Sequence, residues 1–465
     1  MKPARRSFLL GAAAAVASPR GAAAAPNAAV APLPAPRVVA QAVRAEFVHA
    51  WNGYKLIAWG RDEVRPVSGT ANDFFIDGKT FGLSIVEALD TLYVMELDDE
   101  LARCVRWIGD HLELDVDGEV QMFEWVIRIV GGLLAGYAAT GERALLERAR
   151  EAADRVFPCF VKSPTGAPYR YANLRTGAVR EPLMNLAEIG SNVLEFGELS
   201  RLTGDPRYLA ASKRAYAAVL AQRSPIGLLA TYFDIEKGTF TKSVDVAPNP
   251  PVDSFYEYLW GAWEMFGDPA YRDWYRSLTD ASLKYQVDRT ATGLWFRQVD
   301  YLTGAPAGTR QVELAAFYAE LLARGGDREI GAAYYDSWTA VSDRFAIIPE
   351  VFDYASGEVS APGNELRPEY VNAAFELWLL TREQKYRTTA YRYFLALREH
   401  CRVANGYTIV DDVRRRPMKL GDLFPAYAFA ENFKYLYLMF ADAPRFDAEH
   451  HALSTEGKIL RGLRR

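Results

Sequence analysis

Glu124 and Arg128 stand one helical turn apart in the otherwise apolar run MFEWVIRIVGGLL, residues 122–134. Burying either charge alone is costly, so the pair predicts a polar site inside an apolar core. Short turn-like tetrapeptides recur along the chain, and Glu124 lies 16 residues before one of them. Four other acids lie 10 to 15 residues before other tetrapeptides of this kind. If each acid begins a buried helix and these helices run parallel, the acids converge on one pocket. These further acids are Glu188, Asp253, Glu369 and Glu431.

A pocket of acids suits the hydrolysis of a glycosidic bond. One carboxyl group, kept protonated, serves as general acid, and a second, ionised, activates water. Rival chemistries have less support, because the sequence has no GxSxG nucleophile elbow and the GKT at 78–80 lacks the upstream glycine of a phosphate loop.

The recurring turn-like tetrapeptides indicate which helices position these acids. Seven tetrapeptides, such as TGDP at 203–206 and FGDP at 266–269, recur at intervals of 43 to 63 residues. That period is long enough for two helices and their loops, so each unit is predicted to be a helical hairpin.

Two kinds of helix alternate along these units. Segments before the tetrapeptides, such as FKYLYLMF, are apolar almost all round, whereas those after them, such as ALLERAREAADRVF, are amphipathic. An inner and an outer layer follow. We therefore predict an all-α fold, an (αα)7 barrel closed into a toroid, with minor β segments at 227–233 and 406–410.

Composition excludes several classes of partner and scaffold. The formal charge of −5 does not indicate the basic surface that binds nucleic acid. The three cysteines cannot form a disulfide framework, although one bridge remains possible. The five histidines lack zinc-ligand spacing. We expect a monomer that binds a neutral partner.

The N-terminal residues 1–25 begin with a basic stretch, continue with a short apolar run and end in small residues, which predicts an export signal. Arg5 and Arg6 before SFLL resemble the twin-arginine signal of bacterial proteins exported in folded form. Residues 26–37 are rich in alanine and proline and predict a linker, which leaves 38–465 as a single catalytic domain. We expect a periplasmic or secreted protein that has no membrane segment once the signal is removed.

The order of motifs over nearly the whole chain after the linker resembles glycoside hydrolase family 47, the class I α-1,2-mannosidases. The segments that carry the resemblance are WNGYK at 51–55, EALDTLY at 87–93, FEWVIRIVGGLLAGY at 123–137, NLAEIG at 185–190, DSFYEYL at 253–259, LRPE at 366–369, AENFKYLYLMF at 430–440 and STE at 454–456.

The resemblance implies an (αα)7 barrel that hydrolyses terminal α-1,2-linked mannose with inversion and uses one calcium ion. Its three catalytic carboxylates correspond to Glu124, Asp253 and Glu369. Glu369 corresponds to the general base that activates water. Glu124 and Asp253 correspond to the residues on the side of the general acid, and either of them could supply the proton. Thr455 corresponds to the calcium ligand, a role that suits oxygen-rich coordination.

The resemblance also implies a set of residues that bind the sugar or the waters of the metal. Tyr427 is the aromatic residue expected to stack under the bound sugar, and Arg128 and Arg367 are the expected charge partners of the acids. The acids of this set are Glu188, Glu257, Glu431 and Glu456.

Four departures from the family pattern affect metal affinity and the outer subsites more than the catalytic carboxylates. Asn372 replaces an acid, Pro425 lies where the family has another acid, and Glu313 replaces a histidine. After Glu456, the family's Ala-His-Pro becomes GKI at 457–459. Two alternatives therefore stay open: a glycan-binding protein without activity on the same barrel, and a glycosidase for another linkage.

Overall fold

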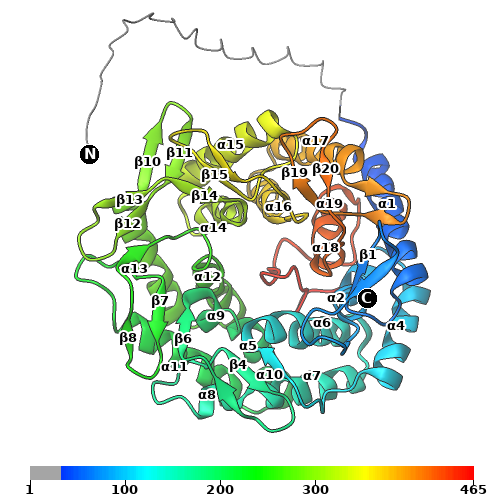
Figure 1. Cartoon of the computed structure of the whole chain (residues 1–465), viewed down its shortest axis with the longest axis horizontal. Coiled ribbons are helices and arrows are strands. Elements are labelled where there is room, and N and C mark those ends of the chain that lie inside the picture. The colour runs from blue at the N-terminus through cyan, green and yellow to red at the C-terminus, as the bar shows by residue number, and fades with distance from the viewer. Residues whose placement is uncertain (1–32, 465) are drawn as a thin grey trace, which may run out of the picture. The chain divides into compact units, whose positions relative to one another are not determined.

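The inner wall of a ring is formed by seven helical segments, most of them made of short consecutive pieces (Figure 1). The computed structural model describes residues 33–464, and those from Ala35 onward form one unit. The inner segments are α2 (Leu83–Glu87) with α3 (Leu89–Val94); α5 (Met122–Glu124) with the π-helical turn η1 (Trp125–Val130) and α6 (Gly131–Thr140); α9 (Leu186–Gly190) with α10 (Val193–Thr203); α12 (Ser254–Phe266); the 3-10 turn η2 (Glu313–Phe317) with α14 (Tyr318–Arg324); α16 (Glu369–Thr381); and α18 (Tyr427–Ala430) with α19 (Asn432–Phe440).

Seven longer helices form the outer layer. In α7, the residues Leu145, Ala149 and Val156 are buried and the charged residues face out, as the amphipathic pattern predicts. The outer helices are α1 (Pro36–Ile57), α4 (Asp98–His111), α7 (Arg143–Val156), α11 (Arg207–Leu220), α13 (Pro269–Tyr285), α15 (Arg328–Phe345) and α17 (Gln384–His400). The predicted (αα)7 barrel is therefore confirmed.

The ring closes between its first and last helices, because α1 packs against α19. The seventh tetrapeptide, at Ala441, is followed by no helix in the described part of the chain, so α1 supplies the outer helix of the last pair. That helix begins at Pro36, so the last two residues of the predicted linker belong to the barrel. The predicted signal at 1–25 lies outside the described residues.

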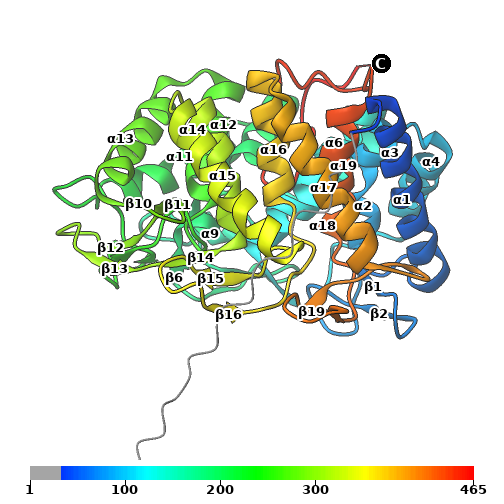
Figure 2. The ribbon, with the colours of Figure 1, turned by 90° about the horizontal axis from the view of Figure 1, so that it is seen from above.

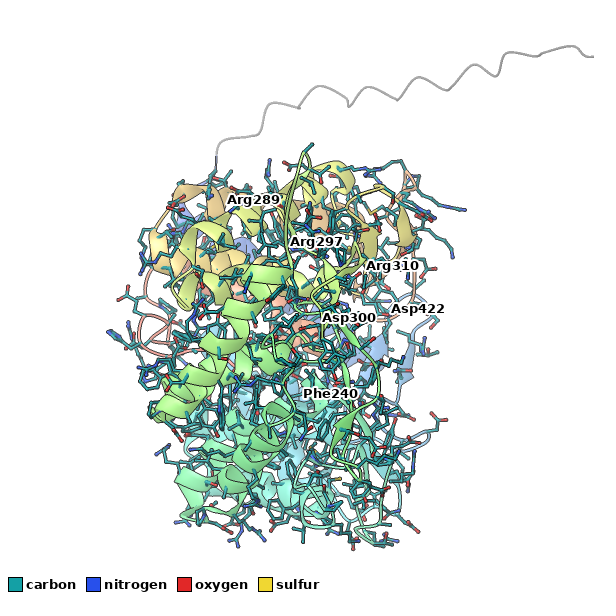
Figure 3. The ribbon with its side chains drawn as sticks, turned by 90° about the vertical axis from the view of Figure 1, so that its left-hand side faces the viewer. Phe240, Arg289, Arg297, Asp300, Arg310 and Asp422 are labelled. Carbon is teal, nitrogen blue, oxygen red and sulfur yellow. The ribbon has the colours of Figure 1, made fainter. Side chains whose placement is uncertain are left out.

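Short antiparallel strands connect outer helices to the inner helices that follow them, and they gather at one end of the barrel (Figure 2). Phe240, Asp300 and Arg310 lie on such strands (Figure 3). The strands are β1 (Glu63–Arg65), β2 (Thr70–Asn72), β3 (Glu119–Gln121), β4 (Tyr171–Asn173), β5 (Val179–Arg180), β6 (Leu183–Asn185), β7 (Tyr232–Asp234), β8 (Thr239–Phe240), β9 (Val244–Asp245), β10 (Val287–Thr290), β11 (Gly293–Phe296), β12 (Gln298–Asp300), β13 (Pro306–Gly308), β14 (Arg310–Val312), β15 (Val351–Asp353), β16 (Val359–Ala361), β17 (Arg402–Val403), β18 (Gly406–Tyr407), β19 (Val410–Asp412) and β20 (Lys419–Leu420).

The inner segment that carries Glu124 is long and apolar enough to cross a membrane by length and composition, but 78% of its apolar window is buried inside the barrel. Its glycines allow close packing. A Cβ on Gly132 would lie 2.6 Å from Cγ1 and 2.8 Å from the carbonyl oxygen of Val86, so only glycine permits this contact between α6 and α2. The segment is a core helix of the ring.

Candidate active site

One cavity of about 250 Å³ opens where the inner helices begin, at the end of the barrel that bears the strands. Phe123, Leu314 and Phe317 give part of its wall an apolar character, while carboxylates and two arginines give the rest a strongly polar one. All eleven residues predicted for the site line it: Glu124, Arg128, Glu188, Asp253, Glu257, Arg367, Glu369, Tyr427, Glu431, Thr455 and Glu456.

Arg128 is the charge partner of Glu124, as predicted, and of two further acids. Its Nε lies 2.6 Å from Glu124 Oε2, and its terminal nitrogen NH1 lies 2.5 Å from Glu456 Oε2 and 3.4 Å from Glu87 Oε1. The π-helical turn η1 between Glu124 and α6 is an irregularity that is frequent at functional sites. Arg128 thus fixes acids from three separate segments.

Asp253 and Glu257 lie at the start of α12, one turn apart. Asp253 is the residue that precedes the helix, yet its side chain makes no capping hydrogen bond and lines the cavity instead. Burial, with the nearby carboxylate of Glu369, raises the pKa of Asp253 to about 7, and the backbone amide of Ser254 opposes that shift. Burial likewise raises the pKa of Glu257 to about 7, and the Thr455 hydroxyl opposes that shift.

Glu369 begins α16 beside Arg367. The Nε of Arg367 lies 3.2 and 3.1 Å from the two carboxylate oxygens of Glu350, and its NH2 lies 2.9 Å from Glu365 Oε2. Arg367 is therefore ion-paired to these two acids, and it acts on Glu369 through its charge. Burial raises the pKa of Glu369, and the Arg367 charge opposes that shift.

Glu188 is held at the start of α9 by three partners. Asn185, the N-cap of the helix, accepts a hydrogen bond from the Glu188 amide at 2.9 Å. The carboxylate accepts from Arg170 Nε at 2.7 Å and from Gln121 Nε2 at 2.7 Å. Both oxygens of Glu188 are therefore oriented before any ligand binds.

Tyr427 lies between the two arginines of the cavity. The guanidinium carbons of Arg128 and Arg367 lie 5.6 and 5.8 Å from its ring centre, and its hydroxyl donates to the carbonyl of Glu365. The two cations restrain the ring by cation–π attraction. A rigid aromatic ring facing a polar cavity suits stacking on a sugar.

Thr455 and Glu456 reach the cavity on the C-terminal segment that runs inside the ring (Figure 1). They lie in a turn in which the Ser454 amide donates to the Lys458 carbonyl at 3.1 Å and the Gly457 amide to the Ser454 carbonyl at 2.8 Å. The side chain of Lys458 is fully buried and bonds to Glu87. Arg461 lies elsewhere, in a second cavity at the other end of the inner helices.

The donors near Thr455 fit a hard cation such as calcium. Glu257, Glu431 and Glu456 line the same cavity and supply oxygens. Burial and the charge of Glu456 raise the pKa of Glu431 well above its usual range, and burial with the charges of Glu87 and Glu124 raises the pKa of Glu456 to about 8. Such repulsion is relieved when a cation binds. Among residues 33–464 no three or more His, Cys, Asp or Glu residues are arranged as direct ligands, so waters and substrate would complete the shell.

Several residues that support the site were not predicted to belong to it. Gln121 and Arg170 hold Glu188, Glu350 holds Arg367, and Lys458 holds Glu87. For Lys458 the sequence carries a signal, because GKI at 457–459 departs from the pattern of the family that the sequence resembles. The other contacts join segments whose proximity only the fold reveals.

Comparison with known proteins agrees with this architecture. Residues 46–462 match the family described as glycosyl hydrolase family 47. The chain belongs to this family and is therefore classed as a glycoside hydrolase.

Individual relatives support the same assignment. A mannosyl-oligosaccharide 1,2-alpha-mannosidase of Arabidopsis thaliana is 31% identical over 90% of this chain and 78% of its own length. The human mannosyl-oligosaccharide 1,2-alpha-mannosidase IB is 32% identical over 89% of this chain and 68% of its own. The solved structure of an alpha-1,2-mannosidase from Trichoderma reesei superposes with a TM-score of 0.82 at 25% identity, covering 91% of this chain and 98% of that one.

Proposed function

We propose that this glycoside hydrolase is an exo-acting α-1,2-mannosidase that releases terminal α-1,2-linked mannose from an oligosaccharide with inversion. The observation that supports the proposal is the convergence of Glu124, Asp253 and Glu369, from three inner helices, on one cavity. The names of the relatives given above describe α-1,2-mannosidases, which supports the linkage and the sugar of this proposal.

The environments of the three carboxyl groups suggest how they divide the work. Glu369 acts as general base and takes a proton from the attacking water. Asp253, whose pKa is raised to about 7, stores the proton that the leaving oxygen needs. Glu124 is held by Arg128 and orients the leaving group or relays that proton through a water. Water attacks from the face opposite the leaving group, which inverts the anomeric carbon.

Calcium is the proposed cofactor. Thr455 would hold it through its hydroxyl and carbonyl oxygens, and Glu188, Glu257, Glu431 and Glu456 would bind its waters or the sugar. When bound, the ion supplies a fixed positive charge that orients two adjacent sugar hydroxyls. Arg128 and Tyr427 orient the same sugar from the side of Glu124.

The N-terminal residues support a proposal about location. The twin-arginine-like signal and the linker predict export to the periplasm or beyond, followed by action on glycans there as a monomer.

A proton NMR time course of α-1,2-mannobiose with calcium, repeated after chelation, tests the activity. We expect β-mannose as the first product, and its loss on chelation. The Glu369→Gln variant is the matched inactive control. Tight binding without turnover by folded wild-type protein would replace the proposal with a glycan-binding function, and turnover of another disaccharide in a linkage panel would replace the linkage.

A further inference from the structure

Behind the cavity wall, Glu313 and Glu369 form a pair of carboxyl groups that the proposed mechanism does not explain. Glu313 begins η2 and Glu369 begins α16, and these two elements pack together. The side chain of Glu313 is completely buried and does not line the cavity, whereas Glu369 opens onto it. Glu313 therefore lies behind the residues that line the cavity and is not itself exposed to it.

The hydrogen bonding of this pair is incomplete if both groups are ionised. Neither oxygen of Glu313 has a partner among the described residues, and neither does Oε2 of Glu369. Two carboxylates cannot donate to each other, and buried orphan oxygens of this kind are costly. A single proton between the two groups would turn one of them into a donor and satisfy an oxygen on each side.

The surroundings decide which group carries the proton. Arg367, two positions before Glu369 in the chain, favours the ionised form of Glu369, and a hydrogen bond donated by Glu313 would favour it further. Burial and the Glu369 charge raise the pKa of Glu313 well above its usual range. The other titratable groups that face the pair are Glu350, Asp253, Glu257, Glu431, Tyr393 and Tyr427, all acids or phenols that cannot neutralise a second carboxylate.

We propose that Glu313 is a positioning residue that remains protonated and donates a hydrogen bond to the carboxylate of Glu369, which fixes that group in its ionised form toward the attacking water. The inference rests on the proposed role of Glu369 as general base. No net proton is consumed, because Glu313 keeps its proton while Glu369 accepts one from water and later returns it. The glutamate that departs from the family pattern thus acts as a neutral donor.

The pH dependence of kcat/KM for α-1,2-mannobiose tests this role in three variants. Glu313→Gln keeps a neutral donor, so the acid limb of the profile should stay in place and kcat should fall less than about threefold. Glu313→Leu removes the donor, so the pKa of Glu369 should rise, the acid limb should move up by about one pH unit and kcat should fall about tenfold. Asp245→Asn, a buried carboxyl outside the cavity, should leave the limb unmoved and serves as control.

Two kinetic outcomes would overturn the proposal. A limb that moves to lower pH in Glu313→Gln would mean that Glu313 is the ionised member, because removing its negative charge would then favour ionisation of Glu369. Profiles that coincide in wild type and both Glu313 variants would leave Glu313 a packing role only.

A difference infrared spectrum of wild type against Glu313→Gln at neutral pH reads the proton directly and needs neither turnover nor the leucine variant. Loss of a protonated-carboxyl band supports the assignment, and loss of a carboxylate band refutes it. Because this readout is independent of activity, the proton assignment can hold even if the mannosidase proposal fails.

Discussion

Lys458 and Glu87 form an ion pair in which both side chains are completely buried, although 371 positions separate them in the chain. Glu87 belongs to α2 and also contacts Arg128, while Lys458 follows Thr455 and Glu456 on the C-terminal segment. The pair therefore connects the segment that carries the proposed calcium ligand to the arginine that orients Glu124.

Replacing Lys458 with methionine should damage both stability and the site, because it leaves the buried carboxylate of Glu87 with only its longer contact, 3.4 Å, to Arg128. We expect a loss of about 3–5 kcal/mol in the free energy of unfolding. Weaker calcium binding should accompany it, measured as a higher calcium midpoint for activity. Lys79→Met, at an exposed lysine, is the control, and a Lys458→Met protein with wild-type stability and calcium midpoint would contradict this account.

Replacing Arg128 with glutamine should reduce kcat by about 100-fold or more, because Glu124 and Glu456 lose the group that fixes their positions. Arg128→Lys should recover only part of the rate, since a lysine ammonium cannot reproduce the fork that reaches several carboxylates. Steady-state kinetics on α-1,2-mannobiose would measure both. Equal activity of the lysine variant and wild type would show that charge alone suffices.

The pH profile of hydrolysis should report the proton on Asp253. A general acid works in its protonated form, so kcat/KM should fall as the pH rises through about 7. Asp253→Asn should lower kcat by about 10²–10⁴-fold and abolish this alkaline limb in the residual activity. If the limb disappears in Glu124→Gln and persists in Asp253→Asn, Glu124 is the proton donor.

Glu195 should make stability depend on pH without affecting catalysis. It lies in α10 outside the cavity, accepts a hydrogen bond from the Tyr258 hydroxyl at 2.7 Å, and has a pKa that burial raises from 4.5 to about 8. A carboxyl with a raised folded-state pKa stabilises the protein fully below its unfolded-state pKa. That contribution is lost as the pH rises to about 8.

Thermal unfolding of wild type and Glu195→Gln between pH 5 and 9 would detect this pH-dependent contribution of Glu195 to stability. The variant should lose less of its Tm over that range than wild type does, whereas Glu147→Gln, at an exposed position, should follow wild type. Parallel curves for wild type and Glu195→Gln would mean that Glu195 does not carry the proton.

The parts of the site that depend on local spacing and on the repeat could be predicted from the sequence. The i,i+4 pair of Glu124 and Arg128 and the placement of acids at the starts of inner helices follow from helical geometry and from the period of the chain. The barrel follows because helices that are apolar all round need a second layer to cover them.

Contacts between distant segments could not be predicted in this way. Nothing local indicates that Lys458 contacts Glu87, or that Arg367 is ion-paired to Glu350 rather than Glu369. Glu313 was recognisable as a departure from the family pattern, but its role depends on the buried oxygens around it. The last outer helix was also not predicted, because α1 precedes every inner helix in the chain and still packs against α19.

That closure has a consequence for biosynthesis. The buried face of α1, which includes Val43, Phe47 and Trp51, packs against α19. Of the inner helices, α19 is the last to emerge from the ribosome. At about 5–20 residues per second, the intervening chain takes about 20 to 80 seconds to make. For that period the nascent protein carries an uncovered apolar helix, so α1 is the segment on which a chaperone would be expected to act until the ring closes.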